Sequence, residues 1–153
     1  FASDIHGSAY WAEKVLARFE EEQADYLVLL GDILYHGPRN PLPKDYNPQA
    51  VIQLLNSIKD KIIAIRGNCD SEVDQMVLDF PILADYSIIY VGKRMIYITH
   101  GHKHNIDSFI KVNGNQIKVV IKNDKHDSTL ANSIMRTIQG EYENSVYIVI
   151  KFE

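Results

Sequence analysis

The 153-residue sequence contains a single cysteine, Cys69, so it cannot form an internal disulfide. This argues against the disulfide-rich secreted class and suits a reducing compartment, so we expect a cytoplasmic protein. Long hydrophobic runs are also absent: stretches such as YLVLL (26–30) are far too short to span a bilayer. No secretory leader is visible, although the sequence starts without Met and so leaves an export signal open, and we expect no association with membranes.

The chain also lacks any block of like charges. Its formal net charge of −4 argues against a general nucleic-acid-binding or membrane-binding surface. Hydrophobic residues make up 46% and charged residues 24% of the chain, which is the mix of an ordinary globular protein. A chain of this length can bury one sizeable core, so we expect a single domain over residues 1–153.

Short apolar runs alternate with amphipathic stretches in the first half of the chain. YLVLL (26–30) and IIAI (62–65) predict strands that are buried on both faces. Apolar residues at helical spacing predict helices over 9–23 and 48–58, with Ser8 as the cap of the first. Alternating strands and helices are typical of an α/β fold with parallel strands.

The second half of the chain favours strand pairs. VGKR (91–94) suits the turn of a hairpin between SIIYV and MIYIT. Further along, the pattern predicts strands over 117–121 and 146–150, and a weak helix near 128–138.

Polar side chains follow the predicted strands at the points where these strands end. Asp4 and His6 follow the first strand, Asp32 the second, Asn68 the third and His100 a later one. Because the carboxyl ends of parallel strands meet at one crevice, we expect these side chains to lie close together. Neighbouring glycines allow the sharp turns that such an arrangement needs.

This set of carboxylate, amide and imidazole groups suits divalent metals such as Mn²⁺, Fe²⁺, Zn²⁺ or Co²⁺. Two such ions about 3.5–4 Å apart can clamp a phosphate and generate hydroxide between them. Asp32, central in the order, is the natural bridging ligand. Each motif alone is more often a turn, a cap or a solvated loop, but their joint occurrence at four strand ends favours a metal centre.

The blocks SDIHG, LGDIL, RGNCD and THGH resemble those of the calcineurin-like metallophosphoesterases, and above all their small bacterial phosphodiesterase branch. The resemblance covers residues 1 to about 104. It implies an α/β fold of the four-layer α/β/β/α sandwich type. It also implies that Asp4 and His6 bind a first metal, that Asp32 bridges, and that Asn68 and His100 bind a second.

The same resemblance implies a cofactor of two divalent ions, with Mn²⁺ as the first candidate and Zn²⁺, Fe²⁺, Co²⁺ or Ni²⁺ as alternatives. It implies a small phosphodiester as the substrate, a bacterial source and self-association into a homo-oligomer. The apolar stretch 80–98 is a candidate for the interface between copies.

The chain departs from the family pattern after residue 104. The family closes its site with a later G-H-x-H and an N-P-G-S turn, whereas residues 105–153 contain one histidine, His126, and no N-P-G-S. GHKH (101–104) fits the letters of G-H-x-H but overlaps the preceding G-H block. Either part of the family's C-terminal third is missing or that third is altered, and the residues leave both open.

Cys69 occupies the position where many relatives carry a histidine that protonates the leaving group. A thiol is a poorer match to that task at neutral pH than imidazole, so we expect a preference for good leaving groups such as aryl oxides. A role as a small, half-buried filler is equally open. His36 and Arg39, on the proline-rich loop 35–48, are candidate contacts for the substrate phosphate, and a simple loop role is open for both.

The sequence therefore predicts a metal-dependent phosphodiesterase with Asp32, Asn68 and Cys69 as catalytic residues. The alternative is a non-catalytic scaffold, since the metallophosphoesterase-like subunit of retromer uses this fold as a binding platform. The presence of His6 favours the enzyme, because a scaffold does not need a complete pair of ligands for the first metal. The lack of the closing histidines favours the scaffold.

Overall fold

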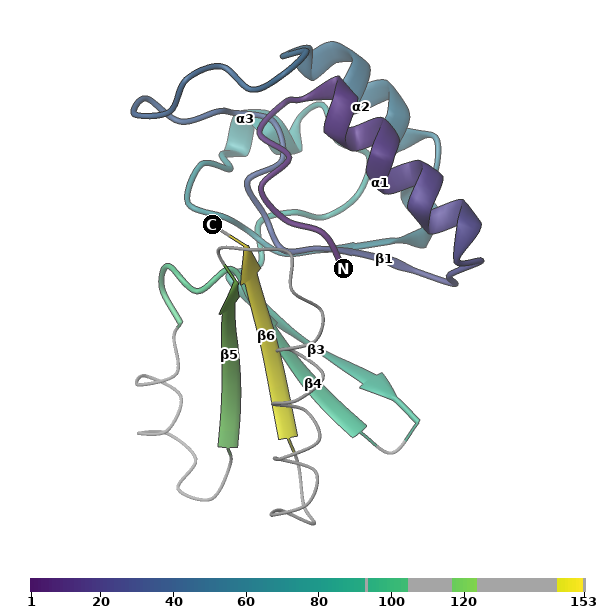
Figure 1. The fold of residues 1–153 in the computed structure, drawn as a ribbon, viewed down its shortest axis with the longest axis vertical. Helices are drawn as coiled ribbons and strands as arrows, with labels where there is room; N and C mark the ends of the chain where they lie inside the picture. The colour runs from purple at the N-terminus through teal and green to yellow at the C-terminus, as the bar shows by residue number, and fades with distance from the viewer. Residues whose placement is uncertain (93, 105–116, 124–145, 153) are drawn as a thin grey trace. The chain divides into compact units, whose positions relative to one another are not determined.

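The computed structural model describes residues 1–92, 94–104, 117–123 and 146–152 of the chain. The chain divides into two compact units, Phe1–Asp85 and Tyr86–Glu153, which are taken separately below (Figure 1). Across the described residues, helices are all too short or too polar to cross a membrane. The predicted helix near 128–138 lies outside the described residues, and the single domain over 1–153 stays a prediction.

The first unit is built on short parallel strands, as predicted. β1 (Leu27–Leu29) pairs in parallel with β2 (Ile62–Ala64). On its other side, β1 meets the N-terminal segment through a parallel bridge between Ala2 and Leu29. The predicted first strand is thus reduced to a bridge, because Asp4 has a φ of 57° and so leaves the extended conformation that a strand requires.

Two helices of the first unit, α1 (Ala9–Glu21) and α2 (Pro48–Asn56), lie side by side (Figure 1). The Ser8 hydroxyl caps α1 by accepting a hydrogen bond from the Trp11 N–H at 3.3 Å. Asn47 caps α2 in the same way, through the Ala50 N–H at 3.1 Å. Both predicted helices are confirmed, and each ends slightly earlier than expected.

Two short helical segments complete the first unit: the 3₁₀ turn η1 (Lys59–Lys61) and α3 (Glu72–Gln75). Ser71 and Asp74 form a capping box at the start of α3, with the Asp74 carboxylate accepting the Ser71 N–H at 2.7 Å. Ser71 is therefore the N-cap of this helix.

The apolar core of the first unit anchors the loops that carry the polar motifs. Ile5, which is 3% exposed, lies between Asp4 and His6 in the sequence, and Ile33, 1% exposed, directly follows Asp32. Full burial of such a side chain stabilises the fold by about 1.5–3 kcal/mol. Each loop is therefore anchored to the core by one buried residue. The core cluster comprises Ile5, Ala12, Leu27, Leu29, Ile33, Leu34, Val51, Leu55, Ile62, Leu78, Phe80 and Ile82.

The second unit consists of strand pairs among its described residues. β3 (Tyr86–Val91) and β4 (Arg94–Thr99) form the predicted antiparallel hairpin. β5 (Ile117–Asn123) and β6 (Val146–Phe152) pair in parallel, and β6 also lies next to β4 (Figure 1). These four predicted strands are confirmed.

Candidate metal centre

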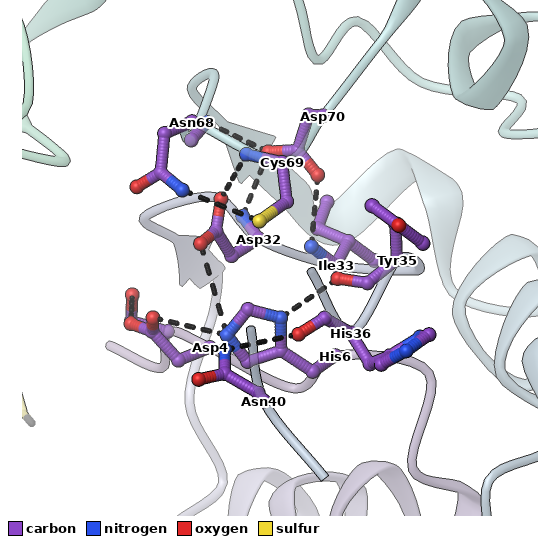
Figure 2. Close-up of polar contacts among 12 residues, drawn as sticks. Asp4, His6, Asp32, Ile33, Tyr35, His36, Asn40, Asn68, Cys69 and Asp70 are labelled. Atoms are coloured by element: carbon purple, nitrogen blue, oxygen red, sulfur yellow. Dashed lines mark hydrogen bonds and ion pairs between the residues drawn. The ribbon is translucent and has the colours of Figure 1, made fainter. Parts of the chain in front are cut away.

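Three loops of the first unit carry four of the five predicted ligands, Asp4, His6, Asp32 and Asn68. The loop after Ala2 runs along the loop after β1, with the Asp4 N–H donating to the Gly31 carbonyl at 3.1 Å and the His6 N–H to the Asp32 carbonyl at 2.9 Å. The loop after β2 carries Asn68 and Cys69. Figure 2 shows side chains from all three loops gathered around His6 and Asp32, as the strand-end argument predicts.

The backbone at this site is unusual. Asp4, His6 and Asp32 have φ values of 57°, 50° and 56°, in the left-handed region that residues other than glycine rarely adopt. Each such residue costs about 1–2 kcal/mol relative to the right-handed conformation. Strained residues of this kind gather at functional sites, where the surrounding structure holds them in place.

His6 is oriented so that its Nε2 atom faces two carboxylates. Its Nδ1 lies 2.7 Å from the Tyr35 carbonyl oxygen, to which it donates its proton. Its Nε2 lies 3.4 Å from Oδ1 of Asp4 and 3.7 Å from Oδ2 of Asp32. A histidine that binds a metal typically donates its second ring N–H to a carbonyl or carboxylate, which fixes the tautomer and the ring plane.

The surroundings of His6 favour a positive charge. The hydrogen bond to Asp4 raises the pKa of His6 to about 9, aided by the Tyr35 carbonyl and the charge on Asp32 and opposed by burial. With a proton on Nε2, the imidazolium ring of His6 is a cation that lies between the carboxylates of Asp4 and Asp32. A divalent ion can replace that proton, so the donor set fits a metal ion.

Asp32 is the central carboxylate of the site and is only 2% exposed. Its Oδ1 accepts the Cys69 N–H at 2.7 Å, while Oδ2 faces His6. Ligand atoms of His6, Asp32 and Cys69 all lie within 4.8 Å of one another. Burial, followed by the charge on Asp32, raises the pKa of the Cys69 thiol to about 11.

The remaining predicted ligands are placed differently. Asn68 lies beside this group with an exposed side chain, and its amide Nδ2 donates to the Cys69 sulfur at 3.2 Å. His100 directly follows β4 and belongs to the second unit. Its role as a ligand alongside Asn68 stays a prediction.

The two predicted substrate contacts lie on the loop after β1. The His36 ring packs edge-on against Tyr35 and Tyr46, with ring centroids 4.9 and 5.2 Å apart, and extends away from Asp4 and Asp32 (Figure 2). Its Nδ1 is buried without a hydrogen-bond partner among the described residues. The Arg39 side chain is exposed. Contact of either residue with a substrate stays a prediction.

Three supporting groups were not predicted. The Ser3 hydroxyl donates to Oδ2 of Asp4 at 2.5 Å, the Tyr35 carbonyl orients His6, and the Asp70 carboxylate accepts backbone N–H groups from both neighbouring turns. Ser3 and Asp70 belong to the SDIHG and RGNCD blocks, so their place in these motifs was a signal that could have identified them. The Tyr35 contact uses a carbonyl, which every residue has, so no residue type could signal it.

Known proteins match most of this chain. The family model described as calcineurin-like phosphoesterase matches residues 1–145. Over 119 residues the chain is 49% identical to Phosphodiesterase YfcE of Escherichia coli strain K12, covering 78% of this chain and 65% of that protein. The protein of the same name from E. coli O157:H7 matches equally well. The chain thus spans just under two thirds of the length of these relatives.

A solved structure agrees with the sequence match. It is described as the structural and biochemical characterisation of YfcE, a phosphoesterase from E. coli. It superposes with a TM-score of 0.72 at 48% identity, covering 80% of this chain and 66% of that chain. The predicted fold family is thereby confirmed, while the four-layer stacking stays a prediction. With a family model that covers nearly all of its length, the chain belongs to the calcineurin-like phosphoesterase family.

Proposed function

We propose that this protein is a metal-dependent phosphodiesterase with a dinuclear metal centre. The observation that carries the proposal is the orientation of His6, whose Nδ1 is fixed by the Tyr35 carbonyl while its Nε2 faces Asp4 and Asp32. The relatives named Phosphodiesterase YfcE support the substrate class, a small phosphodiester. A pure scaffold has no need for a strained backbone that directs three ligands to one point.

The proposed ligands divide between two ions. Asp4 and His6 would hold the first, Asp32 would bridge, and Asn68 and His100 would hold the second. Oxygen and imidazole donors suit Mn²⁺, with Zn²⁺, Fe²⁺, Co²⁺ or Ni²⁺ as alternatives. When bound, such a pair supplies a nucleophile at neutral pH and stabilises the charge that develops on the phosphate.

The side chains of the site restrict the chemistry further. Proton donation to a leaving group is most effective when the pKa of the donor lies near the working pH. The thiol of Cys69, with its pKa raised to about 11, holds its proton too tightly for this task near pH 7. We therefore propose that the enzyme favours esters whose leaving oxygen departs without a proton, such as nitrophenyl esters.

We further propose that the protein acts as a homo-oligomer in a bacterial cytoplasm. The self-association rests on β3, where Tyr86, Ile88 and Tyr90 are 49%, 44% and 71% exposed on alternate positions of one strand. Alternate residues of a strand share one face, so these side chains form an apolar stripe. Large contiguous apolar patches on a protein surface mark interaction sites, and this stripe is our candidate for one.

The test is hydrolysis of bis(4-nitrophenyl) phosphate by metal-stripped protein, with and without Mn²⁺. We expect negligible activity in the absence of metal, recovery with Mn²⁺, and loss of at least a hundredfold for Asp32→Asn. Asp25→Asn is the matched control, because Asp25 is an exposed carboxylate on the turn before β1. Full activity of the stripped protein, or equal activity of the two variants, would contradict the proposal.

A further inference from the structure

Two turns of the first unit hold each other through reciprocal carboxylate bonds. The first turn, Gly31–Ile33, carries Asp32, and the second, Gly67–Asp70, carries Asn68 and Cys69. The Asp70 carboxylate accepts N–H groups of the first turn, and the Asp32 carboxylate accepts the Cys69 N–H of the second at 2.7 Å (Figure 2). Each turn thus fixes the other's backbone with a side chain.

The Asp70 carboxylate accepts three backbone N–H groups. Its Oδ2 accepts the Asp32 N–H and the Gly67 N–H, each at 2.7 Å, and its Oδ1 accepts the Ile33 N–H at 2.8 Å. The residue is 2% exposed, and it forms no ion pair with a described lysine or arginine. A carboxylate that accepts three N–H groups is bound more strongly than a neutral acceptor in the same place.

The two turns also touch at their glycines. A Cβ atom added to Gly31 would lie 2.2 Å from the Gly67 nitrogen, and one added to Gly67 would lie 2.1 Å from Oδ1 of Asp32. At Gly31 the backbone therefore packs directly on the backbone of Gly67, and at Gly67 it packs against the Asp32 carboxylate. Loss of the hydrogen bonds to Asp70 is therefore expected to displace Asp32.

We propose that Asp70 is a positioning residue that sets the metal affinity of the site by fixing the Asp32 carboxylate and the Asn68–Cys69 backbone. This inference rests on the proposed dinuclear centre. Asp70 is not one of the proposed metal ligands. Asp70 acts through the backbone around Asp32, the proposed bridging ligand, because its two oxygens accept the N–H groups of Asp32 and Ile33.

A purely structural role for Asp70 as a helix cap does not account for these contacts. Ser71 and Asp74 already cap α3 through a capping box. Asp74 accepts the Ser71 N–H at 2.7 Å and the Ser71 hydroxyl at 2.9 Å. The two aspartates therefore lie in one segment and both accept backbone N–H groups, but only Asp70 among them reaches the turn of Asp32.

This difference supplies a matched pair of variants. Asp70→Asn keeps the size of the side chain, but its amide presents an N–H₂ group to at least one backbone N–H donor, whichever way it turns. Asp74→Asn makes the same change at the helix cap. Asp70→Ser, which retains one acceptor oxygen, is a second test variant for the case that Asp70→Asn does not fold.

The experiment is calorimetric titration of the metal-free full chain with Mn²⁺, with circular dichroism to confirm folding. Partners behind the ligands of a metal typically change its affinity by about 10–100-fold when they are removed. We expect the folded Asp70 variants to bind Mn²⁺ at least about tenfold more weakly than wild type, and Asp74→Asn to bind within about twofold of wild type.

Each outcome decides between the two proposals. Wild-type affinity in a folded Asp70 variant, or an equal loss in Asp74→Asn, overturns the role of Asp70 and leaves the proposed function standing. Absence of Mn²⁺ binding by the wild type overturns both. Binding is measured without turnover. If the wild type binds Mn²⁺ but lacks phosphodiesterase activity, the proposed function fails, while the role of Asp70 is still decided by the affinities of its variants.

Discussion

Gly31→Ala is the sharpest probe of how the site is built, because the chain offers a control glycine with the same positive φ. Gly31 and Gly101 both have a φ of 94°. A Cβ added to Gly31 would lie 2.2 Å from the Gly67 nitrogen and 2.5 Å from its Cα, whereas one added to Gly101 meets no described atom within 4 Å. The two alanine variants therefore share the cost of the backbone conformation and differ in the collision.

The magnitude follows from these distances. An L-residue in the left-handed region costs about 1–2 kcal/mol, which both variants lose. To relieve the collision, the turn of Asp32 must move about 1 Å from the second turn, and overpacking of this kind typically costs a further 1–3 kcal/mol. A displacement of about 1 Å at a reacting centre is enough to lower activity about a hundredfold.

The assay is urea unfolding followed by far-ultraviolet circular dichroism, with phosphodiesterase activity measured in parallel. We expect Gly101→Ala to lose about 1–2 kcal/mol in the free energy of unfolding, and Gly31→Ala to lose clearly more, together with most of its activity. Equal losses in the two variants would refute the reasoning that direct packing of the two turns positions Asp32.

Three further predictions follow from the site and from β3. Because the pKa of His6 is raised to about 9, the stabilisation by its positive charge is fully present below about pH 6.5 and is lost as the pH rises through 9. After a discount for solvent screening, the free energy of unfolding of the metal-free protein should fall by about 1–2 kcal/mol over that range. Urea unfolding that gives His6→Gln the same pH profile as the wild type would contradict this. Cys69→His should raise activity more for diesters with basic leaving groups than for nitrophenyl esters; equal gains across a series of leaving-group pKa values would show that Cys69 does not stand in the place of the acid. Ile88→Asp, at the centre of the exposed stripe of β3, should shift the particle mass in light scattering from oligomer to monomer; a wild type that is already monomeric at micromolar concentration would count against the interface.

The helices, the strands and the loop residues that lie close together were predictable from the sequence. They depend on the spacing and type of side chains, which the sequence shows directly. The apolar spacing over 9–23 and the cap at Ser8 are local signals, and α1 follows both. The meeting of Asp4, His6 and Asp32 was predictable because parallel strands end at one edge of a sheet. The early end of the first strand was not, because the left-handed backbone at Asp4 depends on contacts with the loop after β1.

The support around the ligands was harder to predict for the same reason. The orientation of His6 depends on a carbonyl of Tyr35, and the position of Asp32 depends on backbone N–H groups that face Asp70. Main-chain groups are the same in every residue, so only their arrangement in space identifies them. For His36 the structure gives the place of the ring, which packs against Tyr35 and Tyr46, while its contact with a substrate stays a prediction.

We propose above all that Asp32 bridges two divalent ions. The most direct test of this is electron paramagnetic resonance of the stripped chain loaded with Mn²⁺, combined with elemental analysis of the bound metal. We expect two Mn²⁺ ions per chain with a spin-coupled spectrum, and loss of that coupling in Asp32→Asn. A single uncoupled Mn²⁺ in the wild type, or a coupled pair that survives in Asp32→Asn, would contradict it.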